Sequence, residues 1–70
     1  MATDIENLVA RVTNMHLDGA PYYPFGHPNA GGDDADYWQA VSELAHHPRF
    51  NDVVGGLPFE IRVDCEGALL

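Results

Sequence analysis

Apolar residues recur at helical spacing near the start of the chain. The stripe consists of Ile5, Leu8, Val9, Val12 and Met15. Spacings of three and four residues predict an amphipathic helix near Thr3–Met15, and residues 3–6 have the form of a capping box. Asp18-Gly19 is a turn signal that ends the element. A strand ending at Leu17 remains an alternative for the second half, where β-branched and short polar residues weaken the helix propensity.

A second helical pattern is clearer, because no helix breaker interrupts it. Its apolar face consists of Trp38, Val41, Leu44 and Ala45, with Tyr37 beside it. The pattern predicts a helix near Asp34–His47, capped by Asp33 or Asp34 and stopped by Pro48. We expect one short further turn over residues 50–54, closed by the glycine pair at 55–56.

The period changes to two near the end of the chain. Apolar Phe59, Ile61, Val63 and Cys65 alternate with polar Glu60, Arg62, Asp64 and Glu66. Strict alternation predicts a half-buried strand near Phe59–Cys65. A strand needs a partner for its backbone amides. The partner is the Met15–Leu17 region, the Tyr22–Phe25 region or a second copy of the chain.

These elements together predict an α+β fold. We expect one small acidic domain over residues 1–70, with two main helices and a C-terminal strand paired within a small sheet or across a homodimer. The predicted core consists of Leu8, Val12, Trp38, Val41, Leu44, Ile61 and Val63.

A loop rich in proline and glycine is expected over residues 20–32, because its breakers exclude a helix and a central strand. They are Pro21, Pro24, Pro28, Gly26, Gly31 and Gly32. Within this loop lie Tyr22, Tyr23 and Phe25. These rings either cover the small core or form a rigid contact site for a partner, since aromatic side chains give a large contact area at low entropic cost.

Charge narrows the classes of partner. The 70 residues include no lysine, three arginines and 11 acidic residues, which give a formal net charge of −8 and a pI near 4.4. Direct binding of nucleic acid or an anionic membrane rests on Lys and Arg, so both are disfavoured. A protein with a basic surface is the natural counterpart. Coding bias, salt adaptation and selection for a negative surface remain open as origins of this charge.

Candidate chemistry is sparse. His16, His27, His46 and His47 match no zinc-ligand spacing, and the aspartates at 33, 34 and 36 lack the glycine and glutamate of a calcium loop. Cys65 falls on the apolar face of the predicted strand, and a lone cysteine forms no internal disulfide. We therefore expect no catalytic residue, metal or cofactor. The start of the chain has neither the basic nor the apolar part of a signal peptide, and no apolar run reaches membrane-spanning length, so a cytoplasmic location is expected.

The sequence favours a small acidic protein-interaction module. One form is a phage- or mobile-element-type inhibitor that mimics nucleic acid and binds a basic, nucleic-acid-binding protein surface. The alternatives are a structural accessory subunit of a larger assembly, or a small metal-binding protein or enzyme that uses the histidines. The predicted partner-binding residues are Tyr22, Tyr23, Phe25, Asp33, Asp34, Asp36 and Glu43.

Overall fold

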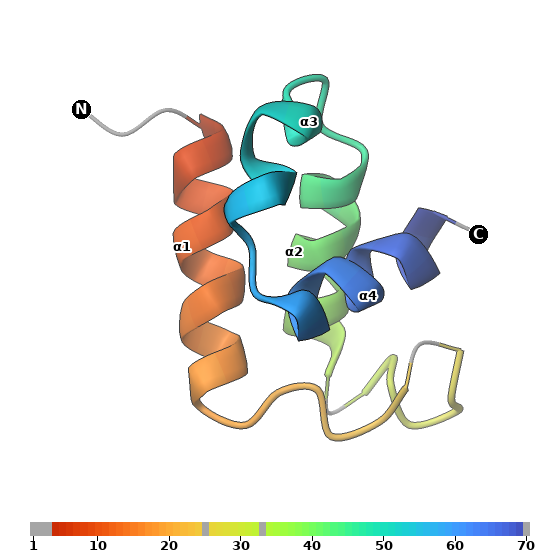
Figure 1. Ribbon diagram of the computed structural model, residues 1–70. Helices are drawn as coiled ribbons and strands as arrows, with labels where there is room; N and C mark the ends of the chain where they lie inside the picture. The colour runs from red at the N-terminus through yellow and green to blue at the C-terminus, as the bar shows by residue number, and fades with distance from the viewer. Residues whose placement is uncertain (1–3, 25, 33, 70) are drawn as a thin grey trace.

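The computed structural model describes residues 4–24, 26–32 and 34–69, and its regular elements are all helical. In chain order they are α1 (Asp4–Leu17), α2 (Ala35–Ala45), α3 (Phe50–Val53), the 3₁₀ turn η1 (Val54–Gly56) and α4 (Phe59–Leu69). Since no described residue lies in a strand, the prediction of an α+β fold is wrong. Figure 1 shows α1 and α2 side by side and running in opposite directions, with α4 crossing them at one end.

Helix α1 confirms the first predicted element and extends it to Leu17. Ile5 and Val12 are buried, while Leu8, Val9 and Met15 pack partly buried against the core. Gly19 has a φ of 108°. The N–H groups of Gly19 and Ala20 donate to the carbonyl oxygens of His16 and Met15 at 3.0 and 3.1 Å. This is a Schellman motif, whose left-handed position favours glycine, and the strand alternative ending at Leu17 is wrong.

Helix α2 confirms the second predicted element. It buries one broad face consisting of Tyr37, Trp38, Ala40, Val41, Leu44 and Ala45. His46 is the C-terminal cap, and its N–H donates to the Ser42 carbonyl oxygen at 3.0 Å. The short turn expected after Pro48 is also present, as α3 followed by η1.

The predicted strand at Phe59–Cys65 lies within helix α4. Pro58 precedes the helix, where its missing N–H costs nothing, and its carbonyl oxygen accepts the N–H of Arg62 at 3.0 Å. A helix pairs its own backbone groups, whereas a strand here would need a second strand, and the described residues form none. The predicted homodimer through a C-terminal strand has no basis in a helical segment.

The core lies between α1, α2 and α4. Five of its predicted members are buried, namely Val12, Trp38, Val41, Leu44 and Ile61. Leu8 is only partly buried. Val63 was predicted for the core but is 47% exposed, because the helical period turns it away from Ile61.

Candidate protein-interaction surface

The aromatic loop is held against the start of α2 by Asp34. One carboxylate oxygen of Asp34 accepts the N–H of Tyr22 at 3.0 Å, and the other accepts the N–H of Tyr23 at 2.6 Å. The residue is only 2% exposed. It occupies the cap position of α2 but makes no side-chain capping bond. Asp34, predicted as a partner-binding residue, is therefore a buried anchor for the loop.

The two tyrosines of the loop differ in exposure. The carbonyl oxygen of Tyr23 accepts the indole N–H of Trp38 at 3.2 Å, and its ring stacks on His27 with the centroids 4.7 Å apart. Tyr22 is 67% exposed. The Tyr22 side chain is thus mostly in solvent, while Tyr23 is partly committed to the fold. Phe25 lies outside the described residues.

The described acidic residues Asp36 and Glu43 line two different hollows. Asp36 is exposed and lines a shallow depression of about 210 Å³ with Tyr22 and Asp34. Glu43 lines a different hollow of about 300 Å³ beside Asn7 and Arg11 of α1. Glu43 follows Asp36 by seven residues, so the two lie on the same side of α2, about two helical turns apart. Asp33 lies outside the described residues.

Helix α4 carries apolar side chains on two opposite faces. Residues two apart on a helix differ by about 200° in direction, whereas residues four apart share a face. The alternating apolar residues therefore divide into two pairs. Ile61 and Cys65 are fully buried against the core, while Phe59 is 70% exposed and Val63 is 47% exposed. We call Phe59 and Val63 the outer ridge of α4.

Sequence reasoning missed the outer ridge, although its signal was present. The alternation that suggested a strand is, on a helix, the pattern of two apolar faces. At the helical period, residues 59–65 contain two apolar pairs at i, i+4, one on each side of the helix.

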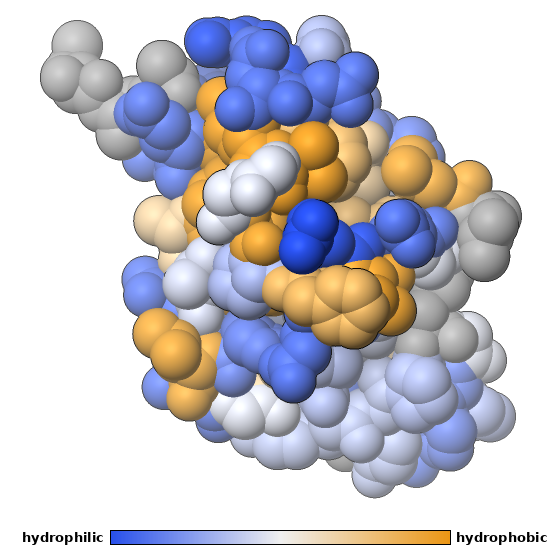
Figure 2. Space-filling view, in the orientation of Figure 1, coloured by the Kyte–Doolittle hydropathy of each residue, from blue (hydrophilic) through white to orange (hydrophobic). Residues whose placement is uncertain are grey.

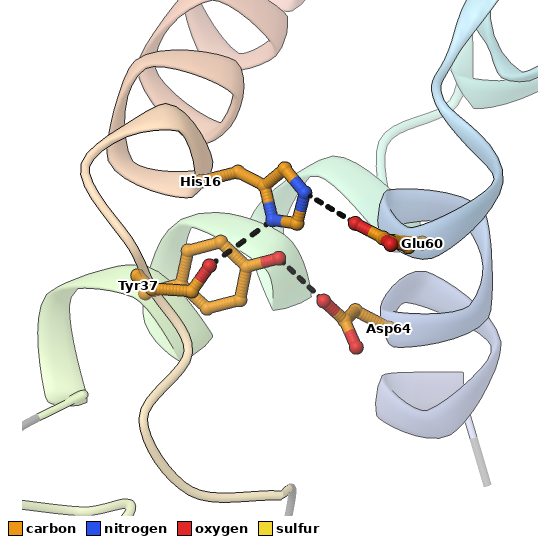
Figure 3. A network of polar contacts seen from close by, with 5 residues as sticks. His16, Tyr37, Glu60 and Asp64 are labelled. Atoms are coloured by element: carbon orange, nitrogen blue, oxygen red, sulfur yellow. Dashed lines mark hydrogen bonds and ion pairs between the residues drawn. The ribbon is translucent and has the colours of Figure 1, made fainter.

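Two polar contacts attach one flank of α4 to the rest of the fold (Figure 3). Oε2 of Glu60 lies 2.8 Å from Nε2 of His16, whose Nδ1 lies 3.0 Å from the Ala20 carbonyl oxygen. Both ring contacts are hydrogen bonds when the imidazole carries two protons, because both partners are acceptors. The hydroxyl of Tyr37 donates to Oδ2 of Asp64 at 2.5 Å. Helix α4 is thus tied to the end of α1 and to α2.

Two groups beneath this flank have raised pKa values, and burial is the largest cause of both shifts. Burial raises the pKa of the Tyr37 hydroxyl, and the hydrogen bond to Asp64 raises that pKa further. Burial also raises the pKa of the Cys65 thiol to about 11, with a smaller contribution from the Asp64 charge. The Cys65 thiol is therefore protonated and poorly reactive at neutral pH.

The surface around the outer ridge is apolar at its centre and charged at its edges. Figure 2 shows apolar surface over η1 and the first turn of α4, bordered by polar side chains. The guanidinium of Arg62 lies 5.8 Å from the centroid of the Phe59 ring, a cation–π distance. Glu60 has a side chain that is 75% exposed, and Glu66 is also exposed.

Neither a metal-holding cluster nor a membrane-spanning helix occurs among the described residues. They contain no group of three or more His, Cys, Asp or Glu side chains placed to hold a metal ion. The histidines make local contacts instead: for example, Nδ1 of His27 and of His47 accept the backbone N–H groups of Asn29 and Arg49. Among the described helices, none combines the length and the apolar character needed to cross a membrane.

Comparison with known proteins found no match to this chain among protein-family models, curated proteins or solved structures.

Proposed function

We propose that this protein is a small acidic module that binds a basic surface of another protein. One observation carries the proposal: among the described acidic residues only Asp34 is buried, so most of the negative charge lies on the surface. Few cations oppose it. Arg49 pairs with Asp52 at 3.1 Å, but both side chains are about 60% exposed, and such a surface pair is weak.

The negative charge on the surface acts at a distance. At about 0.15 M salt the Debye length is about 8 Å, so several carboxylates act together on an approaching cationic surface. Such a field accelerates association and selects the sign of the partner's charge. The partner class that fits is a protein with a basic surface, including the surfaces that nucleic-acid-binding proteins present. A cytoplasmic location is part of the proposal and is supported by the unpaired thiol of Cys65.

The test neutralises surface charge without touching the fold. Asp36, Glu43 and Glu66 are exposed. The triple variant Asp36→Asn/Glu43→Gln/Glu66→Gln should bind any partner captured from a cell extract with a slower association rate and a weaker dependence on salt. The wild-type complex should also be displaced by duplex DNA if the partner's surface is one that binds nucleic acid. An unchanged association rate, measured by surface plasmon resonance from low to high NaCl, would contradict the proposal.

A further inference from the structure

The outer ridge of α4 lies outside the core that the described residues form. Phe59 is 70% exposed and lies one helical turn from Val63, while the opposite face of the same helix supplies fully buried core residues. We propose that this ridge is the docking site for a cationic amphipathic helix of a partner protein. This proposal rests on the proposed function and adds the place of contact and the kind of segment that binds there.

The charges around the ridge select a cationic partner over a second copy of this chain. Glu60 and Glu66 are exposed on α4 near the ridge, and the chain as a whole carries −8. Two copies meeting through their ridges would bring these carboxylates together, and like charges across an interface are costly. A partner with Lys or Arg beside its apolar residues would place opposite charges there. Arg62 is the exception, and it lies over one side of the Phe59 ring.

The shape of the surface favours a helical partner. Phe59 and Val63 are four residues apart on a helix, so their side chains form a row about 6 Å long. In Figure 2 a second apolar area lies near α3 and η1, with hydrophilic surface between it and the first turn of α4. Val53 and Val54 of α3 and η1 are partly buried. A row of this kind packs against the i, i+3 and i+4 positions of an amphipathic helix.

The ridge is also held in place before binding. Glu60 and Asp64 attach one flank of α4 to His16 and Tyr37, and Ile61 and Cys65 fix its inner face in the core. The side chains of the ridge therefore point outward from a helix whose orientation is set on two sides. A preorganised surface loses less entropy on binding than a mobile one.

The experiment uses a synthetic peptide with Lys on its polar face and Leu on its apolar face when helical. One control peptide has the same composition in scrambled order, and another carries Glu in place of Lys. The dissociation constant of each labelled peptide is measured by fluorescence anisotropy with the full chain at about 0.1 M salt. We expect the amphipathic cationic peptide to bind at least about tenfold more tightly than the scrambled one.

Two variants, one at Phe59 and one at Tyr22, locate the contact. The wild-type side chains at these positions are both aromatic and similarly exposed. Phe59 is 70% exposed and Tyr22 is 67% exposed. Phe59→Ser should weaken binding of the amphipathic peptide by about tenfold, whereas Tyr22→Ser should change it by less than about twofold. Val63→Ser provides a second variant on the ridge, and circular dichroism with urea denaturation identifies any variant that has lost its fold. The Phe59→Ser/Val63→Ser double variant should remain a folded helical protein, because neither side chain belongs to the core.

Other outcomes would contradict the proposal in distinguishable ways. Equal binding of the amphipathic and scrambled cationic peptides, unaffected by Phe59→Ser, would leave the proposed function standing and overturn the ridge as its site. A larger loss for Tyr22→Ser would move the site to the aromatic loop. Sedimentation of the wild type as a dimer that Phe59→Ser dissociates would assign the ridge to a second copy. Failure of both cationic peptides to bind would contradict the proposed function as well.

Discussion

The two faces of α4 have similar composition and opposite surroundings. The inner face presents Ile61 and Cys65, both fully buried, and the outer face presents Phe59 and Val63, both exposed. Hydrophobicity alone does not distinguish the pairs, since Phe59 is the largest of the four side chains. The side on which α1 and α2 pack decides which pair enters the core. An exposed apolar pair on a helix whose other face is already buried favours contact with a partner.

The largest contrast is expected from truncation on the two faces. Ile61→Ala should lower the free energy of unfolding by about 2–5 kcal/mol, because it removes buried methyl groups and leaves a cavity. Phe59→Ala should change it by no more than about 0.5 kcal/mol, since the ring is mostly in water. Urea denaturation followed by circular dichroism measures both. Equal losses for the two variants would mean that the outer ridge is part of the core.

A smaller loss of stability is expected at alkaline pH, and it begins with Cys65 on the inner face of α4. The pKa of Cys65 is raised from 9.0 to about 11 in the folded protein. Below pH 9 the Cys65 thiol is protonated in both the folded and the unfolded state, so it does not change the free energy of unfolding. Between the two values the unfolded chain ionises and the folded chain does not, which favours unfolding as the pH rises. Tyr37, whose pKa is also raised, adds to this at higher pH.

The measurement is urea denaturation at a series of pH values from neutral to about 11. Cys65→Ala should flatten the early part of the decline in the free energy of unfolding, because the thiol ionises at a lower pH than the Tyr37 phenol. Labelling of Cys65 by iodoacetamide at mild alkaline pH should be slow in buffer and fast in urea. Rapid labelling of the folded protein would place the thiol at the surface and contradict the assignment of the inner face.

The polar flank that joins the two faces should contribute less. Tyr37→Phe removes the hydroxyl that donates to Asp64 at 2.5 Å and should cost about 1–2 kcal/mol, as expected for a hydrogen bond to a charged group that water partly replaces. Tyr22→Phe is the matched control, because Tyr22 is exposed. Thermal denaturation of the two variants measures the difference. If both lost the same stability, the Tyr37–Asp64 bond would have no net effect.

The smallest predicted effect tests whether the C-terminal segment is helical. A Cβ added at Gly67 meets nothing within 4 Å, and Gly67 lies within α4. Gly67→Ala should therefore stabilise the protein by about 0.5–1 kcal/mol, because alanine has the higher helix propensity. Gly56→Ala, at the end of η1, also meets nothing within 4 Å and serves as the comparison. A loss of stability for Gly67→Ala would argue against a helix at this position.

The first two helices could be predicted because their local signals agree. In α1 the apolar stripe, the acidic first turn and the glycine after the helix all specify the same element. In α2 the apolar face is continuous and Pro48 follows it. The alternation at residues 59–65 is compatible with a strand or with a two-faced helix, and periodicity over so few residues did not separate them. The missing partner strand was the one clue against the strand.

The surroundings of the predicted site residues could not be read from the sequence, for a related reason. Asp34 belongs to a conspicuous acidic cluster, but its two carboxylate oxygens bind the backbone of the loop. Sequence spacing places Asp34 next to Asp36 and gives no sign that one is buried and the other exposed. The hydrogen bonds that join Asp34 to Tyr22 and Tyr23, 12 and 11 positions away, make that difference. They form because the loop folds back against the start of α2.

By itself, the sequence determined the acidity, the two long helices, the turn at Asp18-Gly19 and the irregular loop, because each depends on residues close together in the chain. The tertiary structure alone decided that residues 59–69 form a helix, which of its two apolar pairs is buried, and that Asp34 anchors the loop. The physical reason is that backbone groups and apolar side chains can be satisfied in more than one local way. The packing of α4 against α1 and α2 selects one of these ways, and it leaves Phe59 and Val63 on the surface.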